Sequence, residues 1–143
     1  MLVDTSVVLA YLTGTEPTSE LASQLFDAFV ATGRNQASLS MVTVEEILVR
    51  PFRSGAPAVA RAEGFLRHFG DIRLVGIDYD VAREAARIRA QAGLATPDAL
   101  ILACAVTAGV DMLVTNDRGW RTRIPTISSG LQLCVLADVV STD

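Results

Sequence analysis

The feature that most constrains the fold of this chain is the alternation of short apolar runs with helical patterns. Runs typical of buried strands lie at residues 1–3, 37–41, 72–77, 112–115, 125–127 and 131–136. Apolar residues recur at helical spacing over 7–12, 18–33, 43–51, 57–69, 81–92 and 97–108. Strands that alternate with helices predict a three-layer α/β/α fold with a central, mostly parallel sheet.

Local signals set two of the predicted helix boundaries. Thr43 opens a helix that Pro51 is expected to stop, because proline removes a backbone donor and strains the preceding turn. Thr96 is expected to cap a second helix, with Pro97 in its first turn and Asp98 directly behind. These signals place an acid at the start of an apolar helix.

The length of 143 residues predicts one domain, 1–143, with a substantial core. No apolar run approaches the roughly 18–20 residues that a membrane span needs. The N-terminus lacks a basic segment followed by an apolar one, so no secretory signal and a cytoplasmic location are expected. Half of the residues are hydrophobic, which favours an interface with a second copy or another chain.

The charged residues exclude several classes of function. The net charge is −4, whereas a module that binds nucleic acid through bulk charge should be basic. All twelve basic residues are arginine, so no lysine is present for a P-loop or a Schiff base. Cys104 and Cys134 lie far in sequence from each other and from His68, so zinc spacing is absent and both are expected to be buried thiols. His68 ends a predicted helix and receives no catalytic role.

Four acids, Asp4, Glu46, Asp98 and Asp117, follow strands or open helices. Each also has a purely structural interpretation. Asp4 and Asp98 are favoured at helix N-termini by the helix dipole. Glu46 fits a capping box with Thr43, and Asp117 fits an Asx turn. Taken singly, none of the four predicts a function.

Together the four acids predict a metal site. In an open parallel sheet, ligands bind outside the carboxyl ends of the strands. If strand 37–41 neighbours the first strand, all four acids face one crevice. Clustered carboxylates repel one another, and divalent cations would offset that repulsion. An all-oxygen site suits Mg²⁺, with Mn²⁺ as a substitute, and such an ion can activate water against a phosphodiester. The pattern indicates a metal-dependent nuclease.

The same residues carry a resemblance to a known family. Four ordered segments resemble the motifs of PIN-domain ribonucleases, and the short length together with Val49-Arg50-Pro51 is similar to the VapC toxins of bacterial toxin–antitoxin pairs. The resemblance covers residues 4 to about 120. The segments are Val3-Asp4-Thr5-Ser6, Thr43-Val44-Glu45-Glu46-Ile47-Leu48, Thr96-Pro97-Asp98-Ala99-Leu100-Ile101-Leu102-Ala103 and Val114-Thr115-Asn116-Asp117.

This resemblance implies a PIN-like fold and assigns roles to the acids. Asp4, Asp98 and Asp117 would hold Mg²⁺, while Glu46, in better register than Glu45, would orient or deprotonate the attacking water. Supporting hydrogen bonds are expected from Thr5, Ser6, Thr115 and Asn116. Some members carry a further acid where this chain has Asn116, so the number of metal ions stays open.

The resemblance also implies partners. The substrate would be RNA, cleaved endonucleolytically, and a cognate antitoxin would cover or enter the cleft of a homodimeric toxin. Arginines follow both Glu46 and Asp117, and Arg123 belongs to the second of these segments. A solvated rim is the alternative for the arginines, and packing is the alternative for the tryptophan. Candidate contacts to RNA or antitoxin are Arg50, Arg53, Arg118, Trp120 and Arg121.

Two other functions remain as alternatives. A catalytically idle PIN-fold module would only form a complex with a partner protein, but a scaffold has no need of four clustered acids. A phosphoryl-transfer enzyme with Asp4 as nucleophile would want a second acid two residues on and a lysine. This chain has Ser6 at that position and no lysine, which disfavours that chemistry. Ser6 itself has no histidine evidently placed to activate it as a nucleophile.

Overall fold

The computed structural model describes residues 1–127 and 130–139. Strands and helices alternate along the chain, as the sequence predicted. Their order is β1 (Leu2–Val3), α1 (Thr5–Thr13), α2 (Ser19–Ser23), the π-helix η1 (Gln24–Val30), β2 (Ala37–Ser40), α3 (Met41–Ser54), α4 (Ala56–His68), β3 (Ile72–Val75), α5 (Tyr79–Ala92), α6 (Thr96–Thr107), β4 (Met112–Thr115), α7 (Trp120–Ile127), β5 (Gln132–Val135) and α8 (Leu136–Val139).

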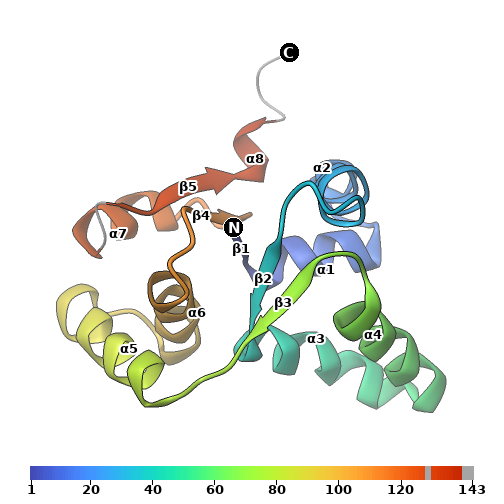
Figure 1. Ribbon diagram of the computed structural model, residues 1–143, viewed down its shortest axis with the longest axis horizontal. Coiled ribbons are helices and arrows are strands. Elements are labelled where there is room, and N and C mark those ends of the chain that lie inside the picture. Colours follow the sequence, from blue (N-terminus) through green and yellow to red (C-terminus); the bar gives the residue numbers. More distant parts are fainter. Residues whose placement is uncertain (128–129, 140–143) are drawn as a thin grey trace.

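The strands form one sheet in the order β3-β2-β1-β4-β5, and every pairing is parallel. The predicted parallel sheet is therefore confirmed. Leu2 of β1 pairs with Ser38 of β2 on one side and with Leu113 of β4 on the other. The strand expected beside the first one does lie there. As a result, the carboxyl ends of β1, β2 and β4 are neighbours at one edge of the sheet (Figure 1).

Adjacent residues of the central strands pack into two separate hydrophobic cores, because successive side chains of a strand point to opposite faces of the sheet. Leu2 and Leu113 pack with α5, α6 and α7 on one face. Val3 and Val114 pack with α1, η1 and α4 on the other face. Figure 1 shows α5 and α6 on one side of the sheet and α1 and α4 on the opposite side. The expected three layers are confirmed.

Helix α6 is buried along most of its length, which explains its nearly continuous apolar sequence. Cys104 lies in its middle, fully buried, and its thiol is 3.3 Å from the hydroxyl oxygen of Ser40. Cys134 on β5 is only partly buried, so the expectation of two buried thiols holds for Cys104 alone. Burial raises the pKa of both thiols, which disfavours reactive thiolates.

The predicted boundaries of α3 are wrong at both ends. The helix begins at Met41, since the hydroxyl of Ser40 accepts a hydrogen bond from the backbone N–H of Val42 at 3.2 Å and so supplies the cap. It also continues through Pro51 instead of stopping there. The last turn is completed because the backbone N–H of Gly55 donates to the Pro51 carbonyl at 3.1 Å.

Two further predictions about elements need correction. The expected strand at 125–127 is wrong, because these residues end α7. The expected helix over 18–33 occurs as two parts, α2 followed by the π-helix η1. Within the described ranges, no single helix is long and apolar enough to cross a membrane. Only when α5 and α6 are taken together do they have the length and apolar composition of a membrane span, and these two helices meet at a bend of 119°.

Candidate functional site

Asp4 is the buried centre of the candidate site. It follows β1 directly and is only 7% exposed. Although Asp4 occupies the N-cap position of α1, its side chain makes no capping hydrogen bond there. Instead, its Oδ2 accepts hydrogen bonds from the hydroxyls of Ser6 and Thr115, each at 2.8 Å. The carboxylate is thus oriented by its own helix and by the end of β4.

Each of these two hydroxyls is itself held by the segment that leaves β4. The backbone N–H of Asn116 donates to Ser6 Oγ at 3.1 Å, and the backbone N–H of Asp117 donates to Thr115 Oγ1 at 3.0 Å. Two backbone amides therefore act through two hydroxyls on a single oxygen of Asp4. A buried carboxylate is stabilised by such hydrogen bonds to its charged form.

Asp98 lies in the first turn of α6, and its side chain is 39% exposed. Burial raises the pKa of this carboxyl above its usual range, and the negative charges of Asp4 and Asp117 raise it further. Arg123 opposes these effects, with its Nη1 3.8 Å from Asp98 Oδ2. The negative charges of Asp4 and Asp117 therefore both reach Asp98.

The start of α6 differs from the expected one. Ala95 occupies the N-cap position and Thr96 is the first helical residue, so Thr96 does not cap the helix with its side chain. Pro97 fits in the first turn because its missing N–H would have no partner within the helix. The position of Asp98 is consequently fixed by the proline and by burial of the helix body rather than by a side-chain cap.

Asp117 follows β4 and is exposed to solvent. Its Oδ1 accepts a hydrogen bond from the backbone N–H of Gly119 at 2.7 Å. This contact is the Asx turn that the sequence offered as a structural alternative. Oδ1 is the carboxylate oxygen that takes part in that turn, and the charge of Asp117 still acts on Asp98. The structural and electrostatic features of Asp117 coexist.

Glu46 connects to the site through Thr5. The Thr5 hydroxyl donates a short hydrogen bond to Glu46 Oε2, and its oxygen lies 2.9 Å from that of Thr43. The capping-box alternative is wrong, because α3 begins at Met41 and places Glu46 in its second turn. Thr43 is fully buried, and this hydroxyl contact was missed because the sequence marks Thr43 only as a cap.

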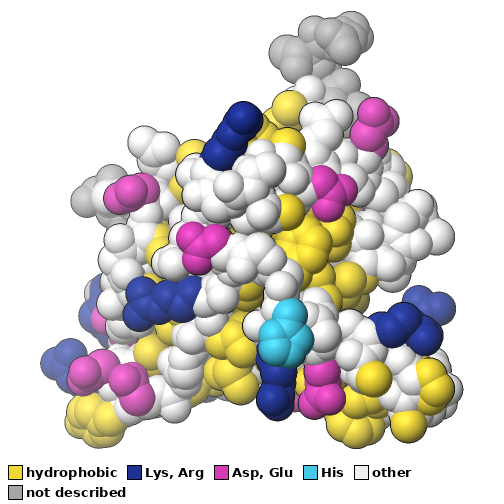
Figure 2. Space-filling view, turned by 45° about the vertical axis from the view of Figure 1, so that its right-hand side comes forward, with side chains coloured by type: hydrophobic (Ala, Val, Ile, Leu, Met, Phe, Trp, Pro, Cys, Tyr) yellow, Lys and Arg dark blue, Asp and Glu magenta, His cyan; other side chains and the backbone are white. Residues whose placement is uncertain are grey.

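The arginines that follow Asp117 occupy two different environments. Arg118 and Arg121 both form ion pairs with Asp138 of α8. Arg123, which sequence reasoning did not separate from them, instead faces Asp98. Trp120 is 1% exposed, so it cannot stack on a base, and the packing alternative is correct. On the face in Figure 2, arginine side chains are scattered over several places among acidic and apolar side chains and form no single large patch.

The other two candidate arginines lie on α3. Arg50 and Arg53 are both exposed, and Arg53 stands in the last turn of the helix, where a cation is favoured by the helix dipole. Arg50 lines a groove of about 560 Å³ between α1, α3 and α4. The groove also contains Leu9, Leu12 and Arg61.

The sequence matches the family model of the PIN domain over residues 1–123. The chain belongs to the PIN domain family. The match begins before Asp4 and extends through Asp117, so all four acids of this PIN domain lie inside it. No curated protein matches the chain.

Solved structures share the fold of this PIN domain. A toxin–antitoxin complex from Klebsiella pneumoniae matches with a TM-score of 0.68 at 23% identity, covering 92% of this chain and 98% of that one. VapBC2 from Rickettsia felis, solved with a promoter DNA fragment, gives 0.67 at 14% identity, with 92% and 95% covered. VapC20 from Mycobacterium tuberculosis, described as a sarcin-ricin-loop-cleaving toxin, gives 0.62 at 18% identity, with 78% and 85% covered.

The residues of this PIN domain fit a hard divalent cation. The donors at the site are all oxygens, the ligand type that Mg²⁺ prefers. Asn116 Oδ1 is buried and has no hydrogen-bond partner among the described residues, so a polar atom at the site remains to be satisfied. Within residues 1–127 and 130–139, no group of three or more acidic, histidine or cysteine side chains forms a ready metal cage. Mg²⁺ commonly binds through one or two carboxylates and keeps several waters, which suits Asp4 and Asp98.

Proposed function

We propose that this PIN domain is a magnesium-dependent endoribonuclease that acts as the toxin of a type II toxin–antitoxin system. The observation that carries the proposal is the buried carboxylate of Asp4, which the hydroxyls of Ser6 and Thr115 hold at the carboxyl end of β1. The charges of Asp4 and Asp117 also raise the pKa of Asp98. The fold likeness to toxin–antitoxin complexes, and to a toxin described as cleaving the sarcin-ricin loop, supports the biological setting.

The residues of the chain would divide the chemistry among them. Asp4, preoriented by Ser6 and Thr115, and Asp98 would hold Mg²⁺, with Asp117 joining directly or through a water. When bound, Mg²⁺ would neutralise phosphate charge and acidify a coordinated water. Glu46, fixed through Oε2 by Thr5, would use its other oxygen to orient or deprotonate the attacking water.

Replacement of Asp98 by Asn tests the site. The variant keeps the shape of the side chain but lacks the negative charge, so RNA cleavage should fall by about 100-fold or more. Growth inhibition on expression should disappear as well. Asp80→Asn is the matched control, because Asp80 also lies in the first turn of a helix, α5, away from β1 and β4. A folded Asp98→Asn variant that cleaves RNA like wild type would contradict the proposal.

The same assay addresses the binding-module alternative. A wild-type protein that binds its partner but cleaves no RNA with Mg²⁺ or Mn²⁺ would support the idle module. The idle module is disfavoured because a scaffold has no need of a buried carboxylate held by two hydroxyls.

The cognate antitoxin is proposed to dock in the groove between α1, α3 and α4. Its wall contains the apolar side chains of Leu9, Leu12 and Ile47, and Arg50 and Arg61 add positive charge. A segment with apolar and acidic side chains would complement both features. Arg50 therefore fits an antitoxin contact better than an RNA contact.

Charge reversal in the groove tests this docking surface. Arg61→Glu should weaken antitoxin binding about tenfold, because it replaces attraction by repulsion. Arg67→Glu, on the same helix α4 but outside the groove, should leave that affinity within about twofold. Titration of labelled antitoxin into each variant measures the difference. Equal affinities for the two variants would contradict the assignment.

The expected homodimer and cytoplasmic location remain predictions. Several large apolar side chains are exposed, with Phe52 at 67% and Tyr79 at 79%, and burial against a second copy would remove them from water. Light scattering of the purified protein measures the mass directly. A monomer over the full concentration range would contradict the dimer.

A further inference from the structure

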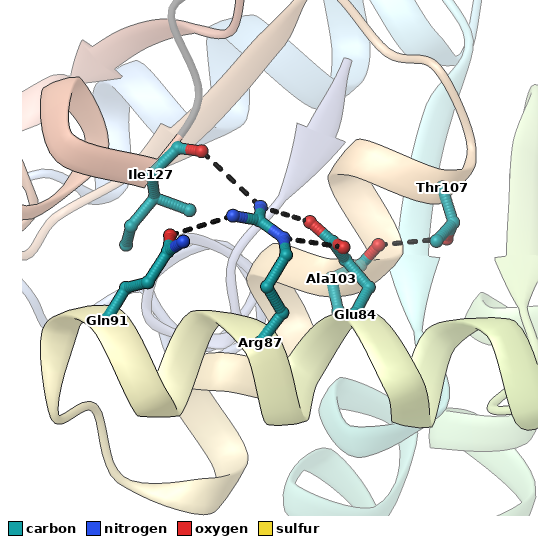
Figure 3. Close-up of polar contacts among 6 residues, drawn as sticks. All are labelled: Glu84, Arg87, Gln91, Ala103, Thr107 and Ile127. Carbon is teal, nitrogen blue, oxygen red and sulfur yellow. Dashed lines mark hydrogen bonds and ion pairs between the residues drawn. The ribbon is translucent and has the colours of Figure 1, made fainter.

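Helix α7 fixes Arg123 beside the acid site. Trp120, Ile124 and Ile127 are 1%, 3% and 7% exposed, and their spacing places one face of the helix in the core. At the end of α7, the guanidinium of Arg87 on α5 donates to the Ile127 carbonyl at 3.5 Å (Figure 3). Arg123 thus projects from a helix that is held along its length.

The contact between Arg123 and Asp98 is poorly suited to stabilising the fold. The 3.8 Å between Nη1 and Oδ2 exceeds hydrogen-bond distance, so the two groups interact through charge alone. Both side chains are about two-fifths exposed, at 41% and 39%. Exposed pairs of this kind contribute little to the free energy of folding.

The position of Arg123 has an electrostatic consequence at the site. Asp98 experiences the negative charges of Asp4 and Asp117, and Arg123 is the positive charge that counters them. Arg118 and Arg121 have a different acidic partner, Asp138. Arg123 therefore acts on Asp98 with the sign of charge that a bound cation would have.

We propose that Arg123 is a positioning residue of the acid site, pairing with Asp98 until a divalent cation takes that carboxylate and then donating to a phosphate oxygen of bound RNA. This inference rests on the proposed function. The guanidinium and a metal ion are both positive, so they compete for Asp98. When a guanidinium leaves Asp98, it remains near the acid site because α7 is packed in place. The planar arrangement of its N–H donors matches the oxygens of a phosphate.

The proposal predicts opposite effects on two affinities. Removal of the Arg123 charge should strengthen metal binding, since a competing cation is lost, and should weaken RNA binding, since a phosphate donor is lost. A residue with a merely structural role would weaken both, or neither. Tighter metal binding together with weaker RNA binding therefore distinguishes a positioning residue from a merely structural one.

Titration of Mn²⁺ without RNA, followed by electron paramagnetic resonance, provides the first measurement. Arg123→Gln should lower the Kd for Mn²⁺ about three- to tenfold. Arg121→Gln is the control for metal affinity, because Arg121 lies on the same helix, is 48% exposed and pairs with Asp138. Its Kd for Mn²⁺ should stay within about twofold of wild type.

Cleavage kinetics provide the second measurement. Arg123→Gln should raise KM for RNA about tenfold with a smaller change in kcat. Arg123→Lys keeps the charge but lacks the fork, so its Mn²⁺ affinity should stay within about twofold of wild type while KM remains raised. This conservative variant also keeps the comparison meaningful if Arg123→Gln folds poorly.

Equal Mn²⁺ affinities of Arg123→Gln and Arg121→Gln would overturn the inference while leaving the proposed function intact. An unchanged KM in Arg123→Gln would overturn it as well. A wild-type protein that neither binds Mn²⁺ nor cleaves RNA would overturn the proposed function and this role together. Tighter Mn²⁺ binding with a raised KM is the result expected.

Discussion

At the scale of single residues, structural and chemical roles overlap at the candidate site. Asp117 closes an Asx turn through Gly119 and also acts on the charge of Asp98. Asp4 stands at a helix N-cap position, yet its carboxylate accepts hydrogen bonds from the hydroxyls of Ser6 and Thr115 instead of capping the helix. A helix or turn position therefore does not by itself exclude a site residue, because one carboxylate has two oxygens that serve different partners.

The Thr115 hydroxyl gives a direct test of how Asp4 is held. Thr115→Val keeps the side-chain shape but removes a donor to buried Asp4 and an acceptor for the Asp117 amide. Stability should fall by about 1.5–3 kcal/mol, measured by urea unfolding. Thr115→Ser keeps the hydroxyl and loses one methyl group, so it should lose only about 0.8 kcal/mol.

The two variants should also differ in Mn²⁺ affinity, with Thr115→Ser close to wild type and Thr115→Val weaker. Equal stability and equal affinity of the two variants would show that the hydroxyl does not orient Asp4.

The four acids could be chosen as candidates from sequence because Asp4 and Asp117 follow strands, Asp98 opens a helix and Glu46 was expected to lie near the start of one. Their roles stay predictions. The choice of Glu46 over Glu45 agrees with the structure in one respect, since Glu46 receives the Thr5 hydroxyl and Glu45 is exposed. Arg123 could not be singled out. The segment after it resembles a strand, and its contact with Asp98 joins residues 25 positions apart in different helices.

At the scale of elements, the junction between α4 and β3 depends on one glycine. Gly70 has a φ of +49°, and a Cβ there would lie 2.6 Å from the Val30 carbonyl oxygen and 2.7 Å from Ala31 Cα. Both obstacles are backbone atoms at the end of η1, which cannot rotate away. Gly70→Ala should therefore destabilise the protein by about 2–4 kcal/mol in chemical unfolding.

Gly64, inside α4, is the control for Gly70, because a Cβ there meets nothing within 4 Å. Gly64→Ala should stabilise the protein by about 0.5–1 kcal/mol, since alanine loses less backbone entropy in a helix. If both variants changed stability equally, close packing against η1 would not explain why glycine is required at position 70.

An aromatic cluster joins α1, η1 and α4 and should make stability depend on alkaline pH. Tyr11 stacks with Phe26, Phe65 and Phe69 and donates to Asp27 at 2.8 Å. Burial, with the Asp27 contact, raises the pKa of Tyr11 from 10.0 to about 12. The native state thus prefers the neutral phenol, and its advantage is present below pH 10 and lost as pH rises towards 12.

Comparison with Tyr11→Phe checks this prediction, because phenylalanine cannot ionise. The stability of wild type relative to Tyr11→Phe should decline as pH rises from 10 towards 12, the window between the ordinary and the raised pKa. Urea unfolding at a series of pH values measures the difference. A constant difference across that range would contradict a raised pKa for the partly buried Tyr11.

Helix ends and helix type were the least predictable elements. The Ser40 cap is a local signal, but Thr43 offered a competing one three residues later. The continuation of α3 through Pro51 runs against the local preference of proline. No sequence signal marked η1 as a π-helix. In α7, the β-branched run near its end favoured a strand, but the spacing of Trp120, Ile124 and Ile127 buries a helical face.

At the scale of the whole molecule, the proposed metal site should couple ligand binding to folding. A cation that binds only the native arrangement of Asp4 and Asp98 stabilises it by mass action. At Mn²⁺ concentrations about a hundredfold above Kd, the gain is about 2.7 kcal/mol, or a rise in Tm of about 5–10 °C. Asp98→Asn should lose most of this rise, and Asp80→Asn should keep it, in a thermal melt.

The layered architecture was predictable, whereas the placement of Glu46 near the first strand depended on an assumed strand order. Alternating strands and helices favour parallel strands covered on both faces, whatever the strand order. The position of β2 beside β1 was only assumed, yet it decides whether Glu46 meets Thr5. Strand order arises from long-range packing, such as Leu2 against Leu113, and no local pattern encodes it.

The central position of β1 has a consequence for how the protein is made. Asp4 is synthesised well before Thr115, which holds its carboxylate and lies 111 positions later. A nascent chain therefore cannot assemble the acid site until β4 has been made and has paired with β1. Under the proposed function, polypeptides that still lack β4 would be harmless to the ribosomes that produce them, and hydrolytic capacity would arise only after that strand has been made.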